Sequence, residues 1–306
     1  MIPALTLDAL RVLDAIDRRH SFAAAAEELF RVPSAVSYTV NKLEQDLGVA
    51  LFDRSRRRAE LTPVGRLVLE HGRRILLAAD ELGALARQAA EGWETMLRIG
   101  IDSVLSPGVV FAVVEEFQRV QPRTEIRLVE EVLGGTWDAL NDGRCDLVIG
   151  AAGAPPGPGF GLHPLGQVVF EFAVARDHPL ALLPQPVPER AVADYPTVVV
   201  ADSSRHLPGR SSGLLDGRSR LVVASIEQKI EAQCRGLGVG YLPRHRILRQ
   251  LNEGCLRLLT LETPRAATDI AVAWRRRAMG KGLKWLVARL RTARFDPDDG
   301  LLLAQA

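Results

Sequence analysis

The sequence contains few of the residues from which metal centres, disulfide frameworks and common catalytic sites are built. Its three cysteines, Cys145, Cys234 and Cys255, are far apart along the chain, and none belongs to a CxxC pair. This spacing argues against a zinc site or a disulfide framework and favours three small buried side chains, with a redox switch between two of them as the alternative. The histidines are scattered, and no phosphate-loop or metal-spaced histidine motif occurs. These absences argue against an enzyme, a bound metal and a cofactor.

Long uncharged apolar segments are also missing. No stretch of about 18 residues is uncharged and apolar, so we expect no membrane-spanning helix. The N-terminal segment meets Asp8 and Asp14 before an apolar core forms, which is typical of an amphipathic helix and not of a signal peptide. Hydrophobic residues make up 47% and charged residues 25% of the sequence, which is typical of a folded protein. The length of 306 residues favours two or three domains. We therefore expect a cytoplasmic protein.

A large net charge is absent too, since the whole chain carries only +2. The charge is unevenly distributed, because the segment 31–74 holds nine lysines or arginines and five acidic residues. A basic region on a nearly neutral protein is typical of a surface that contacts phosphate groups. The charge pattern therefore favours a nucleic-acid interface in the N-terminal part of the chain.

The first 62 residues have the helical periodicity and the capping residues of a winged helix-turn-helix. Ser21 is a good N-cap, Pro33 suits the first turn of a helix, and Gly48 suits a left-handed C-cap. An arginine-rich tip between two short extended segments indicates a wing beside the helices. The expected elements are helices over 7–18, 22–29 and 33–47, then strands over 50–53 and 60–62.

The third helix and the wing supply the candidates for DNA contact. A recognition helix reads bases in the major groove from its N-terminal half, and arginines favour a narrow minor groove. Ser21, at a helix N-terminus, is placed either to meet a phosphate or only to cap. For the residues of the helix, the alternative is a face that only contacts solvent. For the wing arginines, the alternative is a run of charges that only keeps the protein soluble, and Arg54 is also placed to pair with Glu44. The DNA-binding candidates are Ser21, Ser34, Ser37, Tyr38, Thr39, Asn41, Lys42, Arg54, Arg56, Arg57 and Arg58.

A single helix of about 28 residues is expected from Pro63 to about Gly92, because this segment has no internal proline. Apolar side chains recur in it at spacings of three and four, which is a heptad seam. Such a seam either pairs two copies of the chain or packs within one chain, and the length of the helix favours pairing. The dimerisation candidates are Val64, Val68, His71, Ile75, Leu82 and Leu85.

From Trp93 onward the pattern changes to alternating strands and helices, which indicates parallel sheets covered by helices. A turn-rich connector at 154–161 separates two such sets, and a late strand and helix return to the first set. We expect lobe I over about 93–162 and 268–300, lobe II over about 163–267, and a loose tail over 301–306. The predicted fold class is α/β, with a winged helix-turn-helix (1–62), a linker helix (63–92) and a two-lobed, periplasmic-binding-protein-like effector domain (93–300).

These residues resemble the LysR-type transcriptional regulators along nearly the whole chain. The match is densest in the first 65 residues and weaker in the second half. It includes SFAAAAEEL (21–29), KLEQDLG (42–48), LFDR (51–54), LTPVG (61–65), RCDLVIG (144–150) and GLGVGYLP (236–243). The resemblance implies a cleft for a small molecule, commonly an organic anion or aromatic acid. It also implies a tetramer, built as a dimer of dimers, that changes DNA bending.

Ligands of two-lobed α/β proteins bind in a crevice at the carboxyl ends of strands. Hydroxyl and helix N–H groups at these strand ends favour a ligand with a carboxylate. The nearby acidic side chains disfavour an anion, so a neutral or amine-bearing ligand is the alternative. Ser103 and Ser225 are placed either to bind the ligand or only to cap helices. The effector-binding candidates are Asp102, Ser103, Val104, Glu131, Val132, Asp202, Ser203, Ser225 and Ile226.

The sequence thus predicts a sequence-specific DNA-binding transcriptional regulator, an activator or a repressor, whose activity a small-molecule effector modulates. Its expected partners are double-stranded DNA, the effector, further copies of itself as a homodimer or homotetramer, and RNA polymerase. Three other classes fit less well. An enzyme would need a catalytic motif. An extracellular solute-binding protein would need a secretion signal and would have no use for residues 1–92. An architectural DNA-binding protein would have no use for the two lobes.

Overall fold

The computed structural model describes residues 5–53, 59–213, 215–277, 279–298 and 300–304. The chain forms two compact units, the first over 1–90 and the second over 91–306. Among the described residues no helix is both long enough and apolar enough to cross a membrane.

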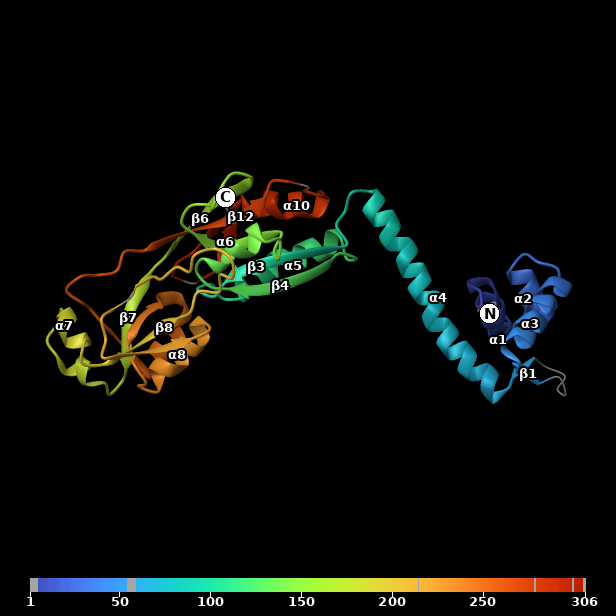
Figure 1. The fold of residues 1–306 in the computed structure, drawn as a ribbon, viewed down its shortest axis with the longest axis horizontal. Helices are drawn as coiled ribbons and strands as arrows, with labels where there is room; N and C mark the ends of the chain where they lie inside the picture. Colours follow the sequence, from blue (N-terminus) through green and yellow to red (C-terminus); the bar gives the residue numbers. More distant parts are fainter. Residues whose placement is uncertain (1–4, 54–58, 214, 278, 299, 305–306) are drawn as a thin grey trace. The chain divides into compact units, whose positions relative to one another are not determined.

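The first unit is a winged helix-turn-helix followed by one long helix (Figure 1). Thr6 and Ser21 cap the first two helices by accepting backbone N–H groups, as their short polar side chains favour. The third helix ends at Gly48, whose φ of 70° is a left-handed conformation that glycine adopts without steric cost. The elements are α1 (Leu7–Arg19), α2 (Phe22–Glu28), α3 (Pro33–Leu47), β1 (Phe52–Asp53), β2 (Glu60–Leu61) and α4 (Pro63–Ala90).

The core of the first unit is enclosed by α1, α2, α3 and the base of the wing. The long helix joins it through Leu69 and through Gly72, where an added Cβ would lie 2.7 Å from Leu10 Cδ2. Glycine therefore allows α1 and α4 to approach closely. The buried apolar side chains include Val12, Leu13, Ile16, Ala25, Ala26, Val36, Val40, Leu43, Leu51, Phe52 and Leu61.

The first lobe of the second unit is a five-stranded mixed sheet with helices on both faces (Figure 1). The strand order is β4-β3-β5-β12-β6; the first three strands are parallel, and β12 is antiparallel to both of its neighbours. Helices α5 and α10 pack on one face and α6 on the other. The elements are β3 (Met96–Asp102), α5 (Gly108–Val120), β4 (Glu125–Glu131), α6 (Gly135–Asn141), β5 (Leu147–Ala152), β6 (Phe160–Val168), β12 (Thr268–Arg275) and α10 (Lys281–Leu290).

The second lobe contains a three-stranded antiparallel sheet, in the order β10-β7-β11, and a parallel pair formed by β8 and β9. Helix α8 packs against this sheet through Ile226 and Ile230, which lie in a buried cluster with Ala173 and Leu242. The elements are β7 (Phe170–Ala175), α7 (Glu189–Val192), β8 (Pro196–Val200), β9 (Ser219–Val223), α8 (Ile226–Cys234), β10 (Gly240–Pro243), α9 (Leu248–Asn252) and β11 (Leu256–Leu259).

Three features of the structure differ from the prediction made from the sequence. Part of the expected connector and the residues after it form β6, which pairs with β12 and extends the first sheet to Val168, beyond the expected limit at 162. Residues 302–304 of the expected loose tail form β14 (Leu302–Ala304), which pairs with β13 (Ala293–Phe295). Only Cys145 is a fully buried cysteine, because Cys234 and Cys255 are half-buried. Each difference depends on contacts between distant segments, which local patterns do not record.

Candidate functional site

The surface of α3 has the division of side chains that a recognition helix needs. Val36, Val40 and Leu43 are buried against the core, so the opposite face points to solvent. On that face Tyr38 is 67% exposed. Ser34, Asn41 and Lys42 are also exposed, and Ser37 and Thr39 are half-buried. Six of the predicted DNA-contacting side chains therefore lie along one helix with its polar face accessible.

Two of the predicted hydroxyl groups have local partners. Ser21 Oγ accepts the backbone N–H of Ala24 at 3.3 Å, which caps α2. Thr39 Oγ1 donates to the carbonyl oxygen of Ala35 at 3.0 Å, one turn back along α3. Capping leaves the hydroxyl proton of Ser21 available to a phosphate oxygen, whereas Thr39 has used its proton within the helix.

The base of the wing is attached to α3 through Glu44. Its carboxylate accepts the backbone N–H groups of Leu51 at 2.7 Å and Phe52 at 3.1 Å. These contacts orient the wing relative to the recognition helix, a role that the sequence pattern did not assign to Glu44. The predicted wing residues Arg54, Arg56, Arg57 and Arg58, and with them the pairing of Arg54 with Glu44, lie outside the described residues.

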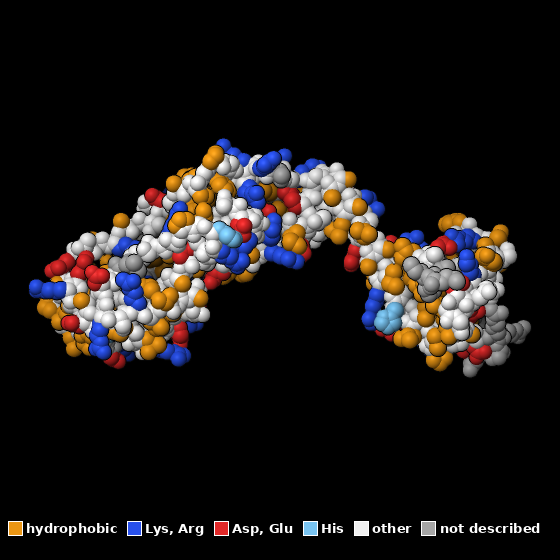
Figure 2. All heavy atoms as spheres, viewed as in Figure 1, with side chains coloured by type: hydrophobic (Ala, Val, Ile, Leu, Met, Phe, Trp, Pro, Cys, Tyr) orange, Lys and Arg blue, Asp and Glu red, His pale blue; other side chains and the backbone are white. Residues whose placement is uncertain are grey.

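The predicted dimerisation residues form an exposed apolar stripe along α4. Leu82 is 68% exposed, and Val64, His71, Ile75 and Leu85 are also exposed. Val68 differs, because it is half-buried against the core of the first unit. Hydrophobic side chains at the surface along α4 are visible in Figure 2.

A cavity of about 270 Å³ opens in the second unit where the predicted strand ends meet. It adjoins a second cavity of about 190 Å³, and the two share Asp102, Val104, Phe170 and Arg265 in their walls. This volume suits a small metabolite. The predicted effector-binding residues that line the larger cavity are Asp102, Ser103, Val104, Val132, Asp202 and Ile226.

Four cationic residues line the cavity and were not predicted: Arg210, Arg220, Lys229 and Arg265, of which the last two have lowered pKa values. Lys229, from the first turns of α8, is buried and has no carboxylate partner among the described residues, and burial followed by the charge of Arg265 lowers its pKa to about 7. Burial likewise lowers the pKa of Arg265 to about 10. The Arg265 guanidinium lies 3.5 Å from the ring centroid of Phe170 and donates to Ser212 Oγ at 2.8 Å. No local signal marks either residue, because tertiary packing brings both to the cavity.

The carboxylates of the cavity are bound by backbone amides. Asp102 accepts the N–H groups of Val104 at 2.9 Å and Leu133 at 3.1 Å, and its complete burial raises its pKa to about 7. Asp202 accepts the N–H groups of Gly134 at 3.0 Å, Ser204 at 2.7 Å and Arg210 at 2.5 Å. Burial opposes ionisation of Asp202, but these hydrogen bonds outweigh it and lower the pKa. Both acids therefore organise the cavity wall.

Three predicted effector-binding residues do not line the cavity. Ser225 Oγ accepts the N–H of Gln228 at 3.3 Å and caps α8. Ser203 Oγ accepts the N–H of Val132 at 2.9 Å and donates to Glu131 Oε2 at 2.5 Å. Glu131 itself is buried and pairs with Arg144. The position of a residue at a strand end does not show which way its side chain points.

The same network ties the loop that follows β8 to the first lobe. Asp138, buried on α6, accepts three consecutive backbone N–H groups of this loop and pairs with Arg144 at 2.9 Å. Burial opposes the charge of Asp138, but these hydrogen bonds outweigh it and hold its pKa well below the usual range. The three donors are the amides of Arg205 (3.1 Å), His206 (2.9 Å) and Leu207 (2.7 Å).

Comparison with known families and proteins identifies both domains. Residues 7–66 match the bacterial regulatory helix-turn-helix protein, lysR family, and residues 90–294 match the LysR substrate binding domain. The chain is 41% identical over 292 residues to the probable HTH-type transcriptional regulator YhaJ of Escherichia coli (strain K12), covering 94% of this chain and 96% of that protein. It is 38% identical to the HTH-type transcriptional regulator PunR of the same strain, covering 92% and 91%.

Solved structures share the fold. A Corynebacterium glutamicum OxyR C206 mutant is similar with a TM-score of 0.57 at 21% identity, covering 100% of this chain and 99% of that one. Full-length LysG from the same organism, with bound effector Arg, has a TM-score of 0.50 at 24% identity, covering 98% and 100%. The two family matches span most of the chain and join a DNA-binding domain to a ligand-binding domain. The chain therefore belongs to the LysR family of bacterial transcriptional regulators.

Proposed function

We propose that the cavity of the second unit binds a small organic anion, and that this anion controls how the protein acts at its DNA operator. The observation that carries the proposal is the pair of cations, Lys229 and Arg265, that line the cavity without a carboxylate partner among the described residues. A buried ammonium without a counter-charge is costly, and a bound carboxylate supplies that charge.

Two further features of the cavity fit a carboxylate. Ser103 Oγ is buried and has no hydrogen-bond partner within the described chain, so it can donate to a ligand oxygen. Asp102 and Asp202, which argued for a neutral or amine-bearing ligand, are bound by backbone amides, and the raised pKa of Asp102, about 7, leaves about half of its carboxyl group neutral at pH 7. Phe170 and Tyr241 add aromatic surface for an apolar part of the anion.

Ser103, which lines the cavity, and Ser225, which does not, give a matched test of the cavity. Ser103→Ala is expected to weaken carboxylate binding by about threefold to tenfold, the contribution of one hydrogen bond. Ser225→Ala is expected to cost about 1 kcal/mol of stability through its lost cap, with the ligand affinity unchanged. Calorimetric titration with a panel of aromatic and aliphatic carboxylates separates the two. Equal affinities for the wild type and Ser103→Ala would show that the hydroxyl does not face the ligand.

For the first unit, we propose that α3 reads operator bases and that the wing arginines contact the DNA backbone and minor groove. Exposure of Tyr38 and of the polar face of α3 supports this assignment. We further propose that α4 pairs two chains and that two such dimers form a tetramer. We propose that this assembly acts in the cytoplasm, contacts RNA polymerase and catalyses no reaction. DNase footprinting on genomic fragments tests the core of this proposal, because a dimer protects an inverted repeat with half-sites about one helical turn apart.

Substitutions in the wing and in α3 are expected to change DNA binding in different ways. Replacing Arg56, Arg57 and Arg58 with alanine should lower affinity for all DNA and reduce the log–log salt slope by up to ~0.9 per lost phosphate contact. Replacing Tyr38 with alanine should change the preferred base sequence while leaving the salt slope nearly constant. Binding isotherms at several salt concentrations, on operator and on scrambled DNA, measure both quantities. If the two variants behave alike, the division between backbone and base contacts is wrong.

A further inference from the structure

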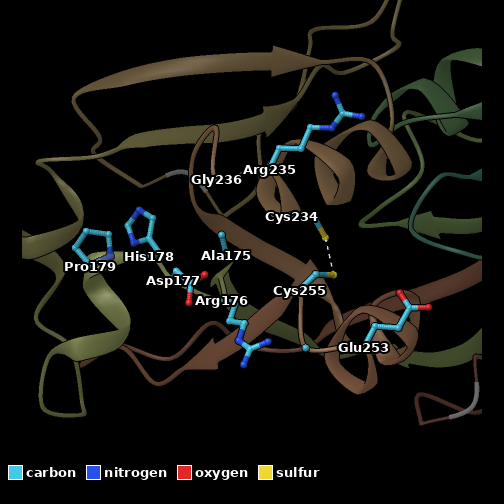
Figure 3. Close-up of a pocket in the computed structure, with 11 residues that line it drawn as sticks. Ala175, Arg176, Asp177, His178, Pro179, Cys234, Arg235, Gly236, Glu253 and Cys255 are labelled. Carbon is cyan, nitrogen blue, oxygen red and sulfur yellow. Dashed lines mark hydrogen bonds between the residues drawn. The ribbon is translucent and has the colours of Figure 1, made fainter.

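Two of the three cysteines lie beside each other in the second lobe. Cys234 Sγ and Cys255 Sγ are 3.2 Å apart, although 21 positions separate the residues in the sequence. Cys234 is the last residue of α8, and Cys255 comes directly before β11. Figure 3 shows the two sulfur atoms pointing toward each other from these two elements. A sulfur pair at this separation needs only a small further approach to reach a covalent bond, which is about 2.05 Å long.

Solvent can reach this pair. Both cysteines are half-buried and form part of the wall of an open hollow of about 620 Å³, shown in Figure 3. This hollow shares no wall residue with the ligand cavity described above. Cys145 provides a contrast within the same unit, because its side chain is fully buried in the apolar cluster between the sheet and α6. A small molecule can therefore approach Cys234 and Cys255 but not Cys145.

We propose that Cys234 and Cys255 form a reversible disulfide by exchange with a low-molecular-weight disulfide. In the first step one deprotonated cysteine attacks a sulfur of the small disulfide, which forms a mixed disulfide and releases one small thiolate. In the second step the other cysteine, after losing its proton to water, attacks the protein sulfur of the mixed disulfide and releases the second thiolate. The protein loses two hydrogens, and one small disulfide is reduced to two thiols.

The position of the pair connects it to the ligand cavity through one helix. Ile226 and Lys229, in the first part of α8, line the cavity, and Cys234 ends the same helix. A disulfide would fix the last turn of α8 to the residue directly before β11. The bond would therefore restrain the element that carries Lys229 while leaving the cavity wall itself unmodified.

Burial and the neighbouring thiol determine how fast this exchange is. Burial, and then the contact with Cys255, raise the pKa of Cys234 to about 12. Because only the thiolate attacks, attack by Cys234 should be slow at neutral pH and faster at mildly alkaline pH.

The test uses the full-length protein and oxidised glutathione as the probe. After incubation at mildly alkaline pH, alkylation of free thiols under denaturing conditions should count one thiol per chain in place of three. Trypsin should yield one cross-linked product, which joins peptide 230–235 to peptide 250–257. Dithiothreitol should restore three thiols. The oxidised protein should also melt roughly 5 °C or more above the reduced protein, because the bond closes a loop in the unfolded chain.

Single substitutions show which of the three cysteines form the cross-link. Cys145→Ser should form the same cross-link as the wild type, whereas Cys234→Ser and Cys255→Ser should stop at a stable glutathione adduct on the remaining partner. The wild-type peptide map decides the question even if a variant folds poorly. Three free thiols after treatment, a persistent glutathione adduct on the wild type, or a cross-link through Cys145 would each overturn the proposal.

Discussion

Replacing Lys229 with methionine is expected to abolish the response to the anionic ligand and, at the same time, to stabilise the second unit. The pKa of Lys229 is lowered from 10.5 to about 7, first by burial and then by the charge of Arg265. At or below pH 7 the fold must therefore hold a buried ammonium ion that the unfolded chain exposes to water. Methionine fills a similar volume without that charge, and such replacements are commonly neutral or stabilising by about 1–4 kcal/mol.

The pH dependence of stability identifies this effect. Between about pH 7 and 10.5 the unfolded chain keeps the proton on Lys229 while the folded chain has lost it. Since the unfolded state then binds more protons, the free energy of unfolding should rise with pH in this interval. Urea titrations at several pH values should show a rise of a few kcal/mol in the wild type and a markedly smaller rise in Lys229→Met. Lys284→Met, at an exposed position of α10, is the matched control and should keep the rise.

Ligand binding supplies the second readout for Lys229. A bound carboxylate should restore the charged form, so binding above pH 7 should take up a proton, and calorimetry in buffers of different ionisation enthalpy measures that uptake. Lys229→Met should lose at least about 2 kcal/mol of carboxylate affinity, or roughly 30-fold, and the proton uptake with it. A variant that binds the same carboxylates with unchanged affinity would show that Lys229 is only a structural residue.

Placing a carboxylate on the exposed stripe of α4 is expected to break the dimer. Leu82 is 68% exposed in a single chain, and the stripe that it shares with Ile75 and Leu85 follows a heptad spacing. In a paired helix Leu82→Asp would bury a charge without a partner, which costs at least about 2 kcal/mol per site. Dimers should dissociate, and operator affinity should fall by more than tenfold, because each recognition helix then binds one half-site alone.

Leu77→Asp provides the control for this substitution. Leu77 is 64% exposed on the same helix, but it lies outside the predicted heptad positions and points to another face. Sedimentation equilibrium should show dimers or tetramers for Leu77→Asp and monomers for Leu82→Asp. A Leu82→Asp protein that remains associated and binds its operator normally would contradict the linker-helix model.

The parts of the fold that local chemistry determines could be predicted from the sequence. Pro33 and Gly48 bound α3 because each residue has its own backbone preference, independent of the rest of the chain. β6 was not predicted, because its strand character comes from pairing with β12, about 100 residues later. Its glycines and Pro164 are also typical of turns. The sequence therefore indicated the order of the elements better than their pairing.

The candidate site shows the same limit at the level of side chains. The rule that strand ends converge located Asp102, Ser103 and Val132 at the cavity. The same rule placed Glu131 there, although its carboxylate turns away to Arg144. Lys229 and Arg265 come from a helix and a loop, and no periodicity distinguishes them from other basic residues. The position of a residue at the end of a strand predicts that it lies near the cavity. The packing of its side chain determines whether it can contact a ligand.

The contact between Asp138 and the loop after β8 sets a limit on how strongly the protein can respond. Three backbone amides of the second lobe bind one buried carboxylate of the first, so the chain itself favours the arrangement of its lobes in this structure. A ligand shifts such an equilibrium only by its difference in affinity between the two arrangements. Where the binding arrangement already dominates, the apparent affinity stays close to the intrinsic affinity, but little population remains to be moved. A sensor built in this way gains sensitivity to scarce ligand at the expense of dynamic range, and the strength of the contacts to one carboxylate sets the balance.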